Sequence, residues 1–151
     1  MSGRGCWRRT TRESAGAACE GLDTNALLRF LTADDPVQTD RVGSLLAAAE
    51  QGGERFFVSV VALCELSWTL RGQPYHLDRG QIAEVLEGIL GTSLLEVQDR
   101  TLVRRSLAAF RQGRADFSDY LLGWLSLEAG CADTVTFDRK LRGATGFSVL
   151  A

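Results

Sequence analysis

The sequence predicts an α/β protein with a mainly parallel sheet. Short runs that are rich in β-branched and aromatic residues alternate with longer segments in which apolar side chains recur at helical spacing. This alternation is typical of βαβ units, whose helices connect parallel strands. The chain has 151 residues, of which 45% are hydrophobic and 24% charged, and both values fit a single globular domain. We therefore expect one domain, over residues 16–151, with one functional site.

The first half of the chain begins with a weak strand. This strand must lie in AACEGL, where Glu20 and Gly21 dilute the apolar run expected of a central parallel strand. Helices follow in TNALLRFLT and from Pro36 to about Gln51. The second of these helices has a capping carboxylate and a first-turn proline in Asp34-Asp35-Pro36, and Gly52-Gly53 ends it.

The clearest early strand is RFFVSV, at about 55–60. The next segment, about 61–71, has helical spacing with Leu63, Leu66 and Leu70 on one face, and a Gly-Gln-Pro sequence breaks it. Glu65 lies among the apolar residues of this helix, which include Trp68. We therefore expect Glu65 to be largely buried and to need a polar partner.

The second half of the chain repeats the alternation. Helices are predicted over about 78–90, 99–112 and 118–129, and a short strand in SLLEV precedes the second of them. Two further strands, in ADTVTF and FSVL, flank a short helical turn at DRKL.

Charge and composition exclude several classes of protein. The net charge is −2, and four of the seventeen basic residues precede Glu13, so the rest of the chain is acidic and unsuited to broad electrostatic binding of nucleic acid. Residues 1–15 lack an apolar period, which favours a disordered or non-native extension; the alternative is a basic arm that contacts nucleic acid. No apolar run reaches the roughly 18 residues of a spanning helix. Four cysteines without C-x-x-C spacing suit reduced thiols, so we expect a cytoplasmic protein without membrane contact.

Four carboxylates occupy positions that suit a site at one edge of the sheet. Asp23 follows the first strand, Asp138 follows ADTVTF, and Glu65 lies in the helix after RFFVSV. Asp119 is at the start of its own helix, from which its side chain can point back toward the sheet. Ligands bind outside the carboxyl ends of parallel strands, so we expect these acids to converge.

Converging acids repel one another at neutral pH, and a bound divalent cation is the ordinary relief. Carboxylate oxygens suit Mg²⁺ or Mn²⁺, and Mg²⁺ commonly combines few protein ligands with waters and a substrate phosphate. Such a metal lowers the pKa of a bound water, orients it for attack and stabilises the leaving oxygen. The pattern therefore indicates metal-dependent phosphate chemistry.

Each acid also has a purely structural interpretation. Asp23 and Asp138 are compatible with simple helix caps, and Asp116 and Asp119 with first-turn acids that the helix dipole favours. We expect Asp116 to be the cap of its helix and Asp119 to face the site. The coincidence of four such acids favours a catalytic cluster.

Other chemistries lack their residues. The single histidine, His76, lies in a polar turn and is expected to be exposed, so a histidine-based metal cluster and a two-histidine ribonuclease mechanism are excluded. There is no P-loop, no G-x-S-x-G elbow and no dinucleotide-binding glycine motif. An aspartate-based phosphatase would need a second aspartate two residues after its nucleophile, where this chain has Asn25.

On these residues the chain resembles the PIN domains, and in detail the VapC-type toxins of bacterial toxin–antitoxin pairs, over about residues 20–150. The fragments that carry the resemblance are LDTNALLRFLTADDP, SVVALCEL, ADFSDYLLGWLSLEAGC and TVTFDRKL. The resemblance implies a three-layer α/β/α sandwich with a central, mainly parallel sheet of four to five strands. It also implies cleavage of single-stranded RNA, frequent homodimers, and inhibition by a small cognate antitoxin.

The resemblance assigns a role to each acid. Asp23 and Asp119 would be the principal Mg²⁺ or Mn²⁺ ligands, Glu65 and Asp138 would complete the acidic site, and Asp116 would be an accessory acid. Hydrolysis of the RNA phosphodiester is expected to leave a 5′-phosphate and a 3′-hydroxyl. The small polar residues that would orient the carboxylates are Thr24, Asn25 and Thr136.

Basic residues flank the acidic motifs and are candidates to hold the RNA backbone, although ordinary solvated surface charge explains them equally well. They are Arg111, Arg114, Arg139 and Lys140. Two other functions stay open. One is a PIN-domain nuclease of RNA processing or decay without an antitoxin. The other is a catalytically silent PIN-like module that only binds a protein partner, which the presence of all four acids disfavours.

Overall fold

The computed structural model describes residues 20–151, so the extension predicted for residues 1–15 lies outside the described residues. The described chain forms two compact units. The first comprises residues 20–66 and 89–98, and the second comprises residues 67–88 and 99–151. Two helices, α3 (Val60–Arg71) and α4 (Arg79–Gly91), contribute to both units. None of the helices in residues 20–151 is long and apolar enough to span a membrane.

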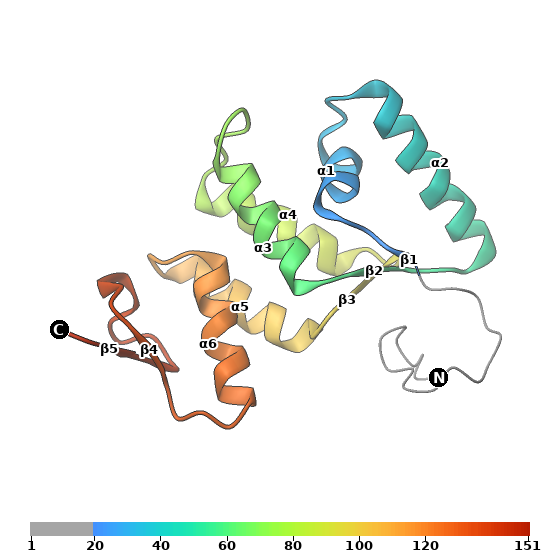
Figure 1. The fold of residues 1–151 in the computed structure, drawn as a ribbon. Coiled ribbons are helices and arrows are strands. Elements are labelled where there is room, and N and C mark those ends of the chain that lie inside the picture. The colour runs from blue at the N-terminus through green and yellow to red at the C-terminus, as the bar shows by residue number, and fades with distance from the viewer. Residues whose placement is uncertain (1–19) are drawn as a thin grey trace. The chain divides into compact units, whose positions relative to one another are not determined.

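The first unit is built on a parallel sheet of three strands in the order β1-β2-β3 (Figure 1). The strands are β1 (Glu20–Gly21), β2 (Phe56–Val58) and β3 (Leu95–Val97). The central strand β2 is apolar and places Phe56 and Val58 in the core, with exposed fractions of 3% and 0%. In contrast, β1 is two residues long and exposed, as the polar character of its sequence predicted.

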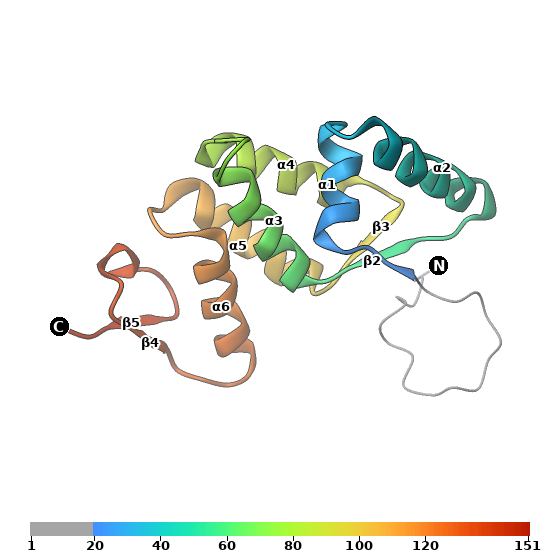
Figure 2. The ribbon, with the colours of Figure 1, turned by 45° about the horizontal axis from the view of Figure 1, so that its top comes forward.

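Two helices, α1 (Thr24–Thr32) and α2 (Pro36–Gly52), connect β1 to β2 and pack against each other (Figure 2). The Asp35 carboxylate caps α2, since its Oδ1 accepts a hydrogen bond from the Gln38 N–H at 3.0 Å. Gly53 ends the helix in the left-handed region, with φ of 68°. The predicted helix is thereby confirmed, together with its capping carboxylate and its terminating glycines, and it extends one residue further than predicted, to Gly52.

The second unit is built around α5 (Arg100–Gln112) and α6 (Phe117–Glu128), which lie side by side in both views (Figures 1 and 2). The rings of Phe110 and Phe117 meet edge to face, with 6.3 Å between their centres. Two short parallel strands, β4 (Thr134–Thr136) and β5 (Phe147–Val149), flank the 3₁₀ helix η2 (Arg139–Leu141). A Cβ added to Gly123 of α6 would lie 2.4 Å from the Phe147 ring, so a glycine lets β5 approach this helix.

The predicted α/β class with parallel strands is confirmed, but the strands are distributed differently from the expectation. Within residues 20–151 they form a parallel sheet of three and a separate parallel pair, where one sheet of four to five strands was expected. The pair lacks the two covered faces typical of a central parallel sheet, since Val135 is 62% exposed.

One prediction about α3 is wrong. Leu63, Leu66 and Leu70 do form its buried face, each no more than 1% exposed. Glu65, however, is exposed, and Trp68, three residues further along the helix, is 49% exposed. The apolar composition of the segment suggested burial on all sides, but residues three apart share a face of a helix, and this face is the open one.

Candidate active site

Asp23 lies at the carboxyl end of β1 and caps α1. Its backbone is extended, and its Oδ1 accepts a hydrogen bond from the Ala26 N–H at 2.8 Å. The partial positive charge of a helix N-terminus favours a carboxylate at this place. A carboxylate has about four acceptor positions, so the capping bond leaves capacity for a cation. The simple capping role and a metal-binding role are therefore compatible in Asp23.

Glu65 is held by the residue that follows Asp23. The Thr24 hydroxyl donates to Glu65 Oε2 at 2.6 Å, across 41 positions of sequence. Asp23, Thr24 and Glu65 line one pocket of about 360 Å³, together with Ser59 and Phe57. This pocket lies at the carboxyl ends of β1 and β2, the edge where parallel sheets bind ligands. The first unit therefore brings together two of the four predicted acids.

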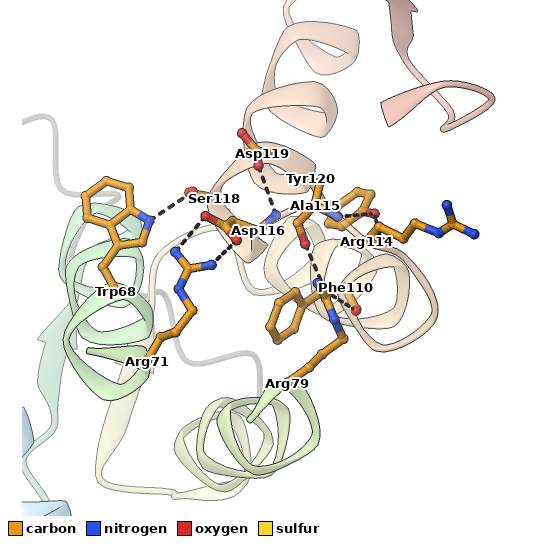
Figure 3. A network of polar contacts seen from close by, with 10 residues as sticks. All are labelled: Trp68, Arg71, Arg79, Phe110, Arg114, Ala115, Asp116, Ser118, Asp119 and Tyr120. Carbon is orange, nitrogen blue, oxygen red and sulfur yellow. Dashed lines mark hydrogen bonds and ion pairs between the residues drawn. The ribbon is translucent and has the colours of Figure 1, made fainter. Parts of the chain in front are cut away.

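In the second unit, Asp116 and Asp119 lie at the N-terminus of α6 (Figure 3). Asp116 occupies the predicted N-cap position. Its N–H donates to Asp119 Oδ2 at 2.9 Å, so Asp119 folds back over the first turn of the helix. The Asp116 carboxylate itself is paired with Arg71, whose Nη2 lies 2.7 Å from Oδ2 while Nη1 contacts Oδ1. Sequence reasoning foresaw the position of Asp116 but not this partner.

The Arg71–Asp116 pair changes the ionisation of both groups. The hydrogen bond from Arg71 is the main cause that lowers the pKa of Asp116 below its ordinary value, with partial burial acting in the opposite direction. The charges of Lys140 and Arg79 lower it further. In return, the hydrogen bond to Asp116 raises the pKa of Arg71. Asp116 is thus an ionised carboxylate whose charge is matched by a bidentate guanidinium.

The loop before α6 is fixed from two sides (Figure 3). Arg79 Nη1 donates to the carbonyl oxygens of Phe110 and Ala115, each at 2.8 Å, and the guanidinium lies 4.4 Å from the centre of the Phe110 ring. The Tyr120 hydroxyl accepts from the N–H groups of Arg114 and Ala115 at 3.1 and 3.3 Å. Sequence reasoning missed three residues of this region, Arg71, Arg79 and Tyr120. The partners of the two arginines lie 31 or more positions away, where no local motif marks them. Tyr120 bonds backbone groups only five and six positions before it.

Asp138 follows β4 and caps η2. Its Oδ1 accepts from the Lys140 N–H at 2.9 Å, and its own N–H donates to the Thr136 hydroxyl at 3.1 Å. Thr136 therefore contacts the backbone of the acid it was expected to orient. Asn25, in the first turn of α1, is exposed, as is the predicted surface histidine His76.

The donor set fits a metal that keeps waters. In neither unit of residues 20–151 do three or more His, Cys, Asp or Glu side chains form a group that could hold an ion. Mg²⁺ usually takes one or two carboxylates and completes its shell with water and substrate phosphate. The pair of oxygen donors in the pocket of Asp23 and Glu65 suits that chemistry, and it does not suit a closed, all-protein cage.

Comparison with known proteins gives two matches. The family model described as PIN domain matches residues 22–146. The VapC ribonuclease of Aquifex aeolicus (strain VF5) is 27% identical over 121 residues, which cover 80% of this chain and 88% of that protein. No solved structure shows a significant match. The family match begins just before Asp23 and continues past Asp138, so it includes all four acids.

Proposed function

The chain belongs to the PIN-domain family, as the sequence resemblance predicted, and from this premise we propose that it is a metal-dependent endoribonuclease acting on single-stranded RNA. One observation carries the proposal: Asp23 and Glu65 line the same pocket at the carboxyl edge of the parallel sheet, and Thr24 connects them. The similarity to a protein named VapC ribonuclease supports RNA as the substrate.

We assign all four acids to the same hydrolysis. Asp23 and Asp119 would hold the Mg²⁺ or Mn²⁺, and Glu65 and Asp138 would act through waters or hold a second metal. When bound, the metal supplies a water of lowered pKa and neutralises charge on the phosphate. The expected products carry a 5′-phosphate and a 3′-hydroxyl.

The protein's own contribution is to hold the carboxylates in place. The capping bonds fix Asp23 through the Ala26 N–H and Asp119 through the Asp116 N–H, while the Thr24 hydroxyl fixes Glu65. Preorganised groups of this kind lower the cost of assembling charge at the reacting phosphate. Asp116 is already paired with Arg71, which suits an accessory acid better than a principal ligand.

The decisive experiment measures cleavage of a single-stranded RNA by the purified full-length chain. Wild type should cleave with Mg²⁺ or Mn²⁺ and stop when EDTA is added. Asp23→Asn and Asp119→Asn should each lower the rate by about 100-fold or more, since each removes a charged metal ligand. Asp40→Asn, an exposed acid of α2, is the matched control and should cleave as wild type does. Equal cleavage by all four proteins would show contamination or a different site.

We further propose that the enzyme is the toxin of a toxin–antitoxin pair, a homodimer inhibited by a small cognate antitoxin. This part rests on the resemblance to the VapC-type toxins. A short gene directly upstream that encodes a DNA-binding antitoxin would support it. If induced expression leaves growth and translation unchanged while the purified protein cleaves RNA, a role in RNA processing or decay replaces the toxin.

A further inference from the structure

A groove in the second unit gathers positive charge that the chain as a whole lacks. Its volume is about 850 Å³, and its lining includes Arg114, Arg139, Lys140 and Arg142 with no acidic residue. We call it the basic groove. The whole chain has a net charge of −2, so this concentration of cations is a local feature and not a consequence of composition.

Within the described residues, none of the four cations of the basic groove makes an ion pair. Among residues 20–151, the ion pairs are made by Arg29, Arg71, Arg104 and Arg111, and none of these lines the groove. Arg111 was a candidate RNA contact in the sequence analysis, but its Nη2 lies 3.8 Å from Glu87 Oε2. Several cations of one sign that line the same groove and make no ion pair favour an anionic ligand.

Local hydrogen bonds hold the backbone of two residues that supply the charges of the basic groove, Arg114 and Lys140. The Tyr120 hydroxyl accepts from the Arg114 N–H at 3.1 Å, and the Arg114 guanidinium points away from the Arg71–Asp116 pair (Figure 3). On the other side, the Asp138 cap fixes the Lys140 N–H at 2.9 Å, and Leu141 anchors η2 with 2% exposure.

An aromatic ring accompanies the cations. Trp124 lines the basic groove, and the Arg105 guanidinium lies over its ring at 5.2 Å from the centre. A track of cations with an aromatic surface is the usual way in which proteins hold single-stranded nucleic acid, because cations contact phosphates while the ring stacks on a base. An acidic protein segment would use the cations but would gain little from the indole.

We propose that the basic groove is the binding track for the single-stranded RNA substrate, with Arg114, Arg139, Lys140 and Arg142 on the phosphates and Trp124 against a base. This inference rests on the proposed function and adds to it. Compared with the RNA-contact candidates named from the sequence, the groove includes Arg142 in place of Arg111 and adds Trp124. Because its contacts are with phosphate and base and not with metal, binding in the groove does not require the cation that cleavage needs.

The test separates binding from cleavage. Fluorescence anisotropy measures the affinity of the full-length chain for a labelled RNA of about 12 nucleotides in EDTA, over about 50 to 200 mM salt. Arg139→Gln/Lys140→Gln removes two groove charges, and Arg41→Gln/Arg55→Gln removes two exposed charges of the first unit as a matched control. Circular dichroism checks that each variant is folded. If the first pair does not fold, Arg114→Gln/Arg142→Gln takes its place.

We expect the groove pair to bind RNA about tenfold more weakly than wild type, and the slope of log K against log salt to become shallower by about 1.4, since each phosphate contact contributes about 0.7 for single strands. The control pair should match wild type. Trp124→Leu should weaken RNA binding about tenfold at an unchanged slope. Trp124→Phe, which keeps an aromatic ring, should retain most of the wild-type affinity.

Unchanged affinity and slope in the groove pair would overturn the groove assignment even if wild type cleaves RNA, and the proposed nuclease function would then stand alone. If the groove pair keeps its RNA affinity but loses binding to polyglutamate, the occupant is an acidic protein segment and the RNA assignment is wrong. If wild type binds RNA through the groove but never cleaves it with metal, the proposed function fails and the groove inference stands.

Discussion

At the scale of single residues, the acids of this chain are held by partners that differ in kind. Asp23 and Asp138 are held by local backbone N–H groups, whereas Glu65 and Asp116 are held by side chains more than 40 positions away, Thr24 and Arg71. Local partners can be inferred from capping patterns, but distant ones cannot.

Thr24→Val removes the hydroxyl donor to Glu65 while keeping the shape of the side chain. We expect the rate of RNA cleavage to fall about 10- to 100-fold, as when a group that orients a metal ligand is lost. The free energy of unfolding should change by no more than about 1 kcal/mol, because the pair is exposed. Thr24→Ser, which keeps the donor, should retain activity. If Thr24→Val and Thr24→Ser lose cleavage activity equally, the Thr24 hydroxyl is not the group that supports cleavage.

Arg71→Gln should raise the pKa of Asp116 toward its ordinary value, because the guanidinium is the main group that lowers it. A carboxyl whose folded pKa is lowered stabilises the protein above its unfolded pKa, and this contribution disappears as the pH falls through the folded value. The stability difference between wild type and variant, within about 1 kcal/mol for so exposed a pair, should thus be present at neutral pH and vanish in acid. Carboxyl NMR titration and pH-dependent denaturation measure both effects.

Arg104→Gln removes an exposed arginine that lies 3.9 Å from Glu87, and it serves as the control for Arg71→Gln. It should leave the titration of Asp116 unchanged. If both variants move that titration alike, general charge and not the Arg71 contact sets the pKa of Asp116.

At the scale of elements, the junction between α5 and α6 positions Asp116 and Asp119. A Cβ added to Gly113 would lie 1.7 Å from the Tyr120 hydroxyl and 3.0 Å from the Ala109 carbonyl oxygen. The close approach lets Tyr120 bond the backbone of the loop, and Arg79 binds the same loop from another side. The backbone φ of Gly113 is −95°, which any residue can adopt. Glycine is therefore needed at this position because a side chain would clash, and not because of the backbone conformation.

Gly113→Ala should destabilise the protein by about 1 to 3 kcal/mol, because backbone and ring must shift to admit the methyl group. Denaturant unfolding measures the loss. A double variant with Tyr120→Phe should lose less than the sum of the single changes, since the two sites are in contact. Gly43→Ala is the contrasting control, because a Cβ there meets nothing within 4 Å and should stabilise α2 by about 0.5 to 1 kcal/mol. Additive losses in the double variant would contradict the steric explanation.

At the scale of the whole molecule, the N-terminal lead differs from the rest of the chain in family match and in charge. The family match covers residues 22–146, and the net negative charge of the chain after Glu13 contrasts with the arginines before it. RNA binding by a chain of this charge must therefore depend on local clusters of cations and not on its overall field.

A chain that starts at residue 16 should unfold with the same free energy as the full chain, because residues 1–15 have no apolar pattern with which to join a core. Its cleavage rate should also be unchanged. Denaturant unfolding and the RNA cleavage assay check the two statements. A marked drop in RNA affinity with unchanged stability would show instead that the four arginines of this segment form a basic arm on the substrate.

The amino-acid sequence was sufficient to predict the succession of helices and strands, the capping signals at Asp23, Asp34-Asp35 and Asp138, and the resemblance to the PIN-domain family. These properties depend on residues within a few positions of one another, so periodicity, caps and glycines report them. Each predicted strand contains the observed one, although the strands within residues 20–151 are only two or three residues long.

The packing of the helices and strands determined which side chains meet. It placed Glu65 on the open face of α3 in contact with Thr24, paired Asp116 with Arg71, and divided the strands between a sheet of three and a pair. It also assembled the basic groove from Arg114, Trp124 and the residues of η2 and its following loop. Each of these contacts joins segments far apart in the chain, and their meeting depends on how helices and strands pack, which no local pattern encodes.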